Sequence, residues 1–259
     1  MDQNQKKVLE VAVNAGKILL ENGAEIFRVE ETISRIARAY QVETEESFVL
    51  SNGFFTTAYD GDGNFFAKVK HIPVSAARLN RVAAVNQLSR EIEEKHYSIE
   101  EVEAALEEIK KMPGKTKRAQ IFSSGLGSAC FCFLFGGNFE DSAIAFIVGL
   151  LLYCYVLGIS RKYLSKIIAN ISGGALVTML AILFYHLHLG DHLDQVVIGS
   201  IIPLVPGLSF TNSIRDIADG DYISGSVRML DALLVSICIA VGVGAVFTIY
   251  HRITGGAVI

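Results

Sequence analysis

Charged residues are scarce in this chain. Only 19% of its 259 residues are Asp, Glu, Lys or Arg, whereas 51% are hydrophobic. A soluble domain carries about a quarter charged residues, so the shortfall indicates membrane segments. The charges are also uneven: residues 1–118 hold 17 of the 23 basic and 19 of the 27 acidic side chains. The composition therefore predicts a water-soluble first part and a lipid-facing second part.

Other features are missing, and each absence narrows the function. The net charge of -4 is small and no basic stripe is present, so nucleic acid is not expected as a partner. All four cysteines lie in apolar runs without a CxxC spacing, which argues against disulfides and zinc sites. No GxxxxGK or strand-linked GxGxxG motif occurs, so no nucleotide cofactor is predicted. No other cofactor, no metal site and no catalytic residue is predicted either.

The first domain, predicted over residues 1–116, has the pattern of an α+β domain. Apolar residues at three- and four-residue steps predict helices over 8–19 and 26–40, with a stop at Asn22-Gly23. Strand-like runs follow at 47–59 and 65–72, and then helices at 78–95 and 98–112, the last with a capping box from Ser98 to Glu101. The expected order is α-α-β-β-α-α. The start lacks a signal-peptide core, so this domain should stay in the cytoplasm.

The segment 60–64 between the two strand-like runs, Asp-Gly-Asp-Gly-Asn, predicts a hairpin turn. Its spacing also matches the start of a calcium loop. The later positions do not fit that alternative, because Phe65 stands at the required glycine and His71 at the bidentate glutamate.

The second domain, predicted over residues 117–259, should cross the cell membrane about five times. Apolar stretches of nearly bilayer length lie at 119–135, 142–159, 167–187, 196–214 and 226–250. Lys and Arg concentrate in alternate connections, which favours a cytoplasmic N-terminus and, with an odd number of spans, an external C-terminus. The fold class expected is a mainly α membrane protein, with an α+β cytoplasmic domain followed by five transmembrane helices. Small residues line several spans, and they indicate close helix packing more plainly than a substrate path. These residues are Ser124, Gly125, Gly127, Ser128, Gly173, Gly174, Gly242 and Gly244.

The fourth stretch is interrupted, since Pro203, Pro206 and Gly207 fall within it. Proline removes a backbone donor, and freed backbone groups at membrane depth are tolerated where they line a cavity or are buried in protein. Broken helices supply binding sites in transporters. Polar side chains directly beyond the break strengthen that interpretation over a simple proline kink: Ser209, Thr211 and Asn212.

Ionisable residues cluster after the break. Near-membrane charges are costly unless they are paired or hydrated, so they predict a substrate or ion pathway, with an interfacial salt-bridge network as the alternative. Arg228 and Asp231 are three residues apart and could share a helix face. The predicted pathway residues here are Arg215, Asp216, Asp219, Asp221, Arg228 and Asp231.

A second polar cluster ends the third predicted span, at His186, His188, Asp191, His192 and Asp194. Imidazole and carboxylate groups could bind zinc or respond to pH. A short hydrated loop is the plainer interpretation.

Two segments resemble the signatures of the threonine/serine exporter family. Residues 19–32, Leu-Leu-Glu-Asn-Gly-Ala-Glu-Ile-Phe-Arg-Val-Glu-Glu-Thr, are similar to its N-terminal signature, at Gly23, Ala24, Arg28 and Glu30. Three neighbouring fragments look like its membrane signature. They are Pro-Leu-Val-Pro-Gly-Leu at 203–208, Asn-Ser-Ile-Arg-Asp at 212–216 and Gly-Asp at 220–221. The positions matched there are Pro203, Pro206, Gly207, Asn212, Arg215, Asp216, Gly220 and Asp221.

The resemblance implies secondary export of small polar metabolites, mainly threonine and serine, with dicarboxylates for some relatives. Long members of the family carry about ten spans, and this chain resembles their first half. Short members are expected to pair with a second small membrane subunit, and a homo-oligomer is also possible. Two alternatives stay open. One is a membrane scaffold or regulator. The other is a membrane-anchored hydrolase that would use Glu21, Arg28, Glu30, Ser51 and His71, although no nucleophile–base spacing supports it.

Overall fold

The computed structural model describes residues 3–42, 44–59, 65–72, 77–160 and 164–255. The chain is mostly helical and divides into two compact units. The first unit combines residues 1–114 with residues 209–229, and the second combines 115–208 with 230–259. A segment from the predicted membrane part therefore belongs to the same unit as the N-terminal residues. The predicted turn at 60–64, with its calcium alternative, lies outside the described residues.

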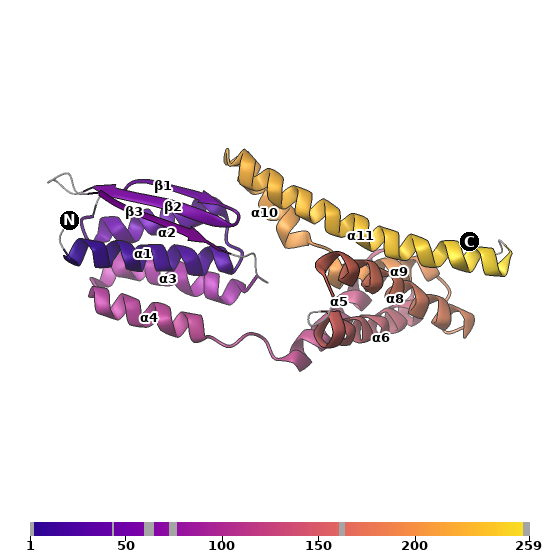
Figure 1. The fold of residues 1–259 in the computed structure, drawn as a ribbon. Helices are drawn as coiled ribbons and strands as arrows, with labels where there is room; N and C mark the ends of the chain where they lie inside the picture. Colours follow the sequence, from indigo (N-terminus) through magenta and orange to yellow (C-terminus); the bar gives the residue numbers. More distant parts are fainter. Residues whose placement is uncertain (1–2, 43, 60–64, 73–76, 161–163, 256–259) are drawn as a thin grey trace. The chain divides into compact units, whose positions relative to one another are not determined.

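The first unit contains a three-stranded antiparallel sheet in the order β1-β2-β3, with four helices on one side of it (Figure 1). The strands are β1 (Thr44–Leu50), β2 (Gly53–Tyr59) and β3 (Phe65–His71). The helices are α1 (Gln3–Glu21), α2 (Ile26–Ala39), α3 (Leu79–Lys95) and α4 (Ile99–Lys111). Their predicted apolar stripes form the core, where Leu19, Ile33 and Phe54 are fully buried.

The prediction of a single strand over 47–59 is wrong, because the chain turns back at Ser51-Asn52 and forms β1 and β2. Leu50 pairs with Gly53 across this turn, and Gly53 pairs with His71 on β3. A Cβ at Gly53 would collide with the carbonyl oxygen of Lys70, so glycine permits this close strand approach.

The predicted capping box of α4 is confirmed. The Ser98 hydroxyl accepts a hydrogen bond from the Glu101 amide at 3.3 Å, and the Glu101 carboxylate accepts one from the Ser98 amide at 2.7 Å. Acidic residues in its first turn and lysines in its last turn complement the helix dipole.

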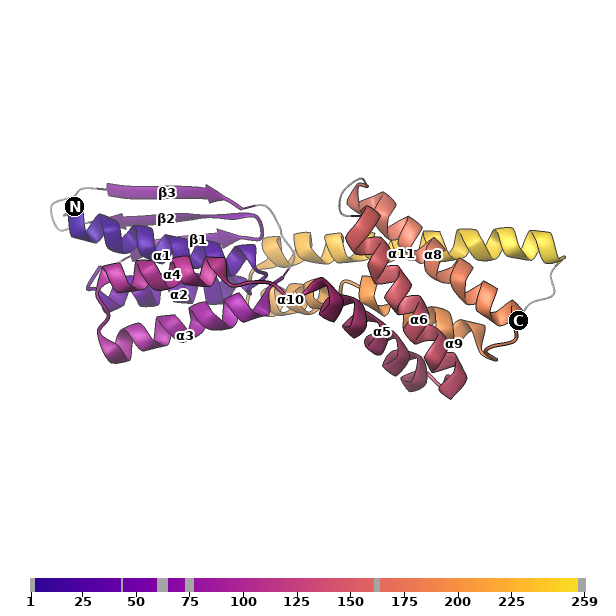
Figure 2. The same cartoon turned by 90° about the horizontal axis from the view of Figure 1, so that it is seen from below.

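The second unit is a bundle of long helices, seen from a second direction in Figure 2. They are α5 (Lys117–Leu134), α6 (Phe139–Tyr155) and α8 (Lys166–His186). A π-helical turn (Val156–Ser160) extends α6 at its C-terminal end. Then α9 (Leu193–Ile201) leads into a 3-10 turn (Ile202–Leu204). After the interruption come α10 (Gly207–Ala218), most of which belongs to the first unit, and α11 (Tyr222–Thr254), which begins in the first unit and continues in the second. The predicted break at Pro203, Pro206 and Gly207 therefore separates two helices.

Three helical segments among the described residues are long and apolar enough to cross a membrane: Phe139–Gly158, Lys166–His186 and Tyr222–Thr254. A fourth is added if α9, its 3-10 turn and α10 count as one broken span. The predicted first span, α5, does not qualify, and its first turn carries Lys117, Arg118 and Gln120. The chain is a multi-pass membrane protein, and the count of five remains a prediction.

Small residues bring the bundle helices together at several of the predicted positions. A Cβ at Gly125 would lie 2.9 Å from the Leu150 side chain, and one at Gly174 would lie 2.7 Å from the Ile239 carbonyl oxygen. Gly127 and Gly244 differ, because a Cβ there would meet no described atom within 4 Å. Helix packing within this chain therefore explains some of these glycines and not others.

Candidate functional site

The turn between α1 and α2 is built by the N-terminal signature. Gly23 has φ +82°, a left-handed conformation that favours glycine. The Asn22 side chain donates to the Ile18 carbonyl oxygen at 2.7 Å and fastens the turn to the end of α1. Asn22 and Ala24 are 3% exposed. The turn is thus fixed from the α1 side.

The hairpin of residues 209–229, made of most of α10 and the first turns of α11, binds this turn. The Asn212 side-chain amide donates to the Gly23 carbonyl oxygen at 3.1 Å. The Arg228 guanidinium donates to the Ala24 carbonyl oxygen, also at 3.1 Å. The first bond joins matched positions of both signatures, and the second joins Ala24 to Arg228, which lies beyond the membrane signature. We call this contact the turn–hairpin joint. Its residues are Gly23, Ala24, Glu25 and Ile26 on one side and Asn212, Arg215, Asp216 and Arg228 on the other.

Asp216 lies at the centre of the joint, with only 1% of its surface exposed. One carboxylate oxygen accepts the Ile26 backbone N–H at 3.3 Å, at the start of α2. The N-cap residue of that helix, Glu25, makes no side-chain cap of its own. The other oxygen of Asp216 lies 2.9 Å from an Arg228 nitrogen. Asp216 therefore caps α2 from a distant part of the chain, and Arg228 neutralises its charge.

Glu25 forms the second charged contact of the joint. Its carboxylate, 12% exposed, pairs with Arg215 of α10 and with Arg28 of α2, the latter at 2.5 Å. Sequence reasoning did not select Glu25. Its position directly before an apolar helical stripe could have drawn attention to it, because acidic side chains are favoured at helix starts.

Two further predicted residues, Glu30 and Asp221, belong to the same unit. The Glu30 carboxylate accepts the Val49 backbone N–H at 3.1 Å, which ties α2 to β1. Burial raises the pKa of Glu30, and the negative charge of Asp221 adds to the rise. Burial also raises the pKa of Asp221, with a further contribution from Asp219. These carboxyl groups therefore hold a proton more readily than ordinary ones.

The other predicted pathway residues lie away from the joint. Asp231 and Lys166 form an ion pair of 2.6 Å in the second unit, with 46% and 58% of their side chains exposed. Arg228 and Asp231 thus have different partners, despite their helical spacing. Pro203, Pro206 and Ser209 are half-buried near the break, whereas Gly207, Thr211 and Asp219 are exposed.

Replacing Gly23 with alanine should lower the free energy of unfolding by about 1–2 kcal/mol, the cost of a left-handed conformation for an L-residue. The new Cβ would also lie 3.0 Å from the Ala77 Cβ. Denaturant titration of the detergent-solubilised protein measures the change. Gly114→Ala is the matched control, because its Cβ would meet only the Arg78 side chain, at 3.9 Å. Equal losses in the two variants would contradict the role of the Gly23 conformation.

The predicted histidine cluster is organised by a residue that sequence reasoning missed, Asp141 of α6. Its carboxylate, fully buried, accepts the backbone N–H groups of Asn138, Asp191 and His192, and lies 2.8 Å from the His192 ring nitrogen Nδ1. Gly190 approaches closely, since a Cβ there would lie 2.8 Å from an Asp141 oxygen. Asp141 thus fastens the α8–α9 loop to α6. The spacing from Asn138 to Asp141 matches a capping box and could have revealed it.

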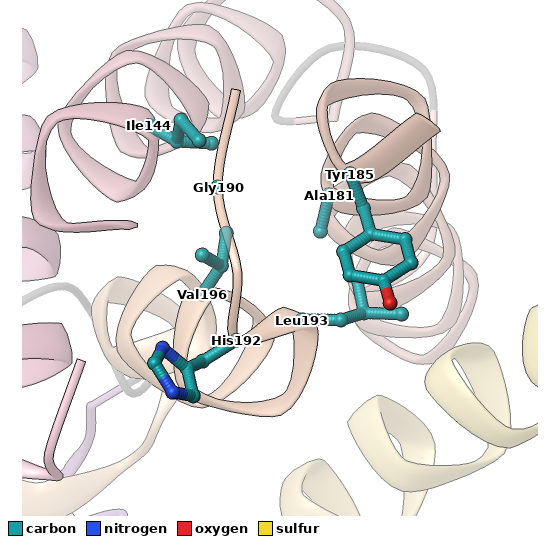
Figure 3. A pocket seen from close by; sticks show the side chains of 7 residues that line it. All are labelled: Ile144, Ala181, Tyr185, Gly190, His192, Leu193 and Val196. Atoms are coloured by element: carbon teal, nitrogen blue, oxygen red, sulfur yellow. The ribbon is translucent and has the colours of Figure 1, made fainter. Parts of the chain in front are cut away.

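Figure 3 shows the small hollow beside this contact. The Ile144 and Val196 side chains point toward the loop at Gly190, and the His192 ring is turned away from Tyr185. His186 has a separate contact, 2.6 Å from the Tyr250 hydroxyl. Two histidines of the cluster therefore have different partners: His192 contacts Asp141, and His186 contacts Tyr250. Within the described parts of the chain, no group of three His, Cys, Asp or Glu side chains is placed to hold a metal ion.

The His192–Asp141 pair should make stability depend on pH. The hydrogen bond to Asp141 raises the pKa of His192 above its ordinary 6.5, and the charges of Asp191 and Asp194 contribute. Since the folded-state pKa is raised, the stabilisation is complete below pH 6.5 and is lost as the pH rises through the folded-state value. Melting temperatures of the wild type should therefore fall relative to His192→Gln as the pH rises from 6.5 through that value, and should differ no further above it. Parallel curves for the two proteins would refute the effect.

Comparison with known proteins supports the signatures. The sequence model of the ThrE family, the threonine/serine exporters, matches residues 10–250 of this chain. The chain is 25% identical over 250 residues to the "Probable succinate transporter subunit YjjP" of Escherichia coli, covering 96% of each chain. A Klebsiella aerogenes protein of that name is 24% identical, with 95% of each chain covered.

The chain is also 24% identical to the "Threonine/serine exporter" of Corynebacterium glutamicum, where 92% of this chain covers 50% of that protein. This chain therefore spans about half the length of that relative and nearly all of the two succinate-transporter subunits. No solved structure shows a significant match. With a family match that extends through both signature segments and nearly the whole chain, the protein belongs to the threonine/serine exporter family.

Proposed function

We propose that this chain is one subunit of a secondary transporter that exports small polar metabolites, with threonine, serine or related amino acids as the first candidates. The observation that carries the proposal is the turn–hairpin joint. It buries the Asp216–Arg228 pair between the two segments that match the family signatures. Buried charges near a membrane are costly and are kept where they serve transport.

The polar groups around the break suggest how a zwitterionic substrate would bind. Its carboxylate would approach the start of α10, near Ser209, Thr211 and Asn212, because helix N-termini attract anions. An acidic side chain would hold the amine or carry a coupling proton. Asp221 suits the proton, since burial raises its pKa.

Dicarboxylates are the second substrate class, favoured by the two relatives named as succinate transporter subunits. A dicarboxylate has no amine for an acidic residue and would depend on arginine. Arg215 is the candidate, because 49% of its side chain remains exposed.

The remaining organisation belongs to the same proposal. The cytoplasmic domain would comprise residues 1–116, and five spans would follow in 117–259, with the C-terminus outside. A second small membrane subunit would complete the transporter, as the word "subunit" in the names of the relatives suggests. A homo-oligomer is the other way to complete it.

Efflux from proteoliposomes tests the function. Vesicles containing the chain, alone or with the subunit that co-purifies with it, are loaded with labelled threonine or succinate under an imposed pH gradient. We expect gradient-dependent efflux of one class, which Asp216→Asn should abolish without unfolding the protein. A folded chain that gives no efflux of either substrate, alone or with its subunit, would overturn the proposal.

The same variants separate the alternatives. A scaffold would keep its partner in folded Asp216→Asn and Asp231→Asn proteins and would show no efflux in the wild type. A hydrolase would cleave substrates in a broad ester and peptide panel, and that activity would depend on Ser51 or His71.

A further inference from the structure

The 209–229 hairpin has an unusual distribution of side chains. Three of its polar residues face the protein: Asn212 is 9% exposed, Ser213 is fully buried and Asp216 is 1% exposed, whereas Thr211, Arg215 and Asp219 are exposed. Several large apolar residues face outward. Phe210 and Ile214 on α10 are 42% and 51% exposed, one helical turn apart.

The start of α11 shows the same arrangement. Tyr222, Ile223 and Val227 are 66%, 66% and 52% exposed, whereas Ser224 is 2% exposed. Gly225 lies on the buried side, because a Cβ there would be 2.9 Å from the Ser213 carbonyl oxygen of α10. The two helices of the hairpin therefore pack through small and polar residues, and each leaves an apolar arc uncovered.

We propose that this hairpin lies in the interface between the lipid headgroups and the hydrocarbon of the membrane, with its apolar arcs in contact with lipid. The continuity of α11 argues for lipid as the occupant, because the hairpin contains the first turns of α11, and α11 as a whole is a 33-residue apolar helix able to span a bilayer. An exposed tyrosine at its first position suits the interface, where aromatic side chains with polar tips concentrate.

A location in the hydrocarbon core fits the hairpin less well. α10 has only 12 residues, about 18 Å of helix, whereas the core is about 30 Å thick. Its opposite side carries Arg215 and Asp216, which are bound to the turn at Glu25 and Ile26. Amphipathic helices with one charged and one apolar side lie in the interface plane.

An interfacial hairpin would also fix the position of the N-terminal signature relative to the membrane. The hairpin binds the α1–α2 turn with its polar side and lipid with its apolar side, so the N-terminal signature is held at the membrane surface. This inference is independent of the transported substrate.

Depth-dependent fluorescence quenching tests the proposal, because the chain has no tryptophan of its own. Phe210→Trp and Ile223→Trp would report on the hairpin in the full chain reconstituted in phosphatidylcholine vesicles. Ile237→Trp, at a 58% exposed position within α11, is the deep reference. Phe55→Trp, on the outer face of the sheet and 47% exposed, is the reference outside the membrane.

The hairpin tryptophans should be quenched at least about twofold more by lipids brominated near the headgroup than by lipids brominated near the bilayer centre, as expected for an interfacial helix. Ile237→Trp should show the opposite order, and Phe55→Trp should be quenched by neither. Two results would overturn the proposal. Hairpin tryptophans that behave like Phe55→Trp would place the arcs in water or against a protein partner. Quenching in the order of Ile237→Trp would make α10 part of a full span.

Discussion

Replacing Asp216 with alanine should lower the free energy of unfolding by about 3–5 kcal/mol, the range observed when one partner of a buried ion pair is removed. The variant leaves Arg228 with a buried charge, since only 14% of its side chain is exposed. It also removes the acceptor of the Ile26 N–H at the start of α2. Denaturant titration of the solubilised protein measures the loss.

Asp231→Ala is the matched control for this prediction. Asp231 is also paired, with Lys166 at 2.6 Å, but the pair is exposed and should contribute only about 0–1 kcal/mol. A double variant sharpens the test. Asp216→Leu combined with Arg228→Met removes both charges and should recover part of the stability, because an apolar pair carries no uncompensated charge. Equal losses for Asp216→Ala and Asp231→Ala would contradict the buried pair.

Replacing Gly242 with valine should destabilise the second unit by about 1–3 kcal/mol, the cost of inserting volume into a packed contact. A Cβ at Gly242 would collide with the Ile171 carbonyl oxygen of α8, and backbone cannot move aside as a flexible side chain can. We therefore expect the upper part of that range. The readout is the free energy of unfolding in detergent.

The chain offers a close control for the Gly242 variant. Gly244 lies two residues further along the same helix, and a Cβ there would meet nothing within 4 Å. Gly244→Val has the same change in helix propensity and apolar surface, so it should alter stability by at most about 0.5 kcal/mol. If both variants lose the same stability, the α8–α11 contact is not the reason.

Much of the fold follows from local patterns. The apolar stripes of α1 and α2, the stop at Gly23 and the capping box of α4 depend on residues close in sequence, and each is confirmed. The prediction of one strand over 47–59 failed at Ser51-Asn52, because a continuous β-like run does not reveal a tight turn between two strands.

The partners of the charged residues were not predictable in the same way. The spacing of Arg228 and Asp231 suggested one shared face, yet each pairs with a residue of another helix, Asp216 of α10 and Lys166 of α8. Glu25 and Asp141 were missed because their importance arises from tertiary contacts. Sequence reasoning selected most residues of the joint from two signatures, but nothing local indicates that the signatures bind each other.

Hydrogen exchange at the Ile26 amide tests the turn–hairpin joint most directly. This N–H belongs to the first turn of α2, where helices leave donors without an internal partner, and its acceptor is the Asp216 carboxylate 190 positions away. The joint predicts slow exchange at Ile26 in the wild type and fast exchange in Asp216→Ala, with the amides of α4 unchanged in both. Identical exchange at Ile26 in the two proteins would contradict the joint.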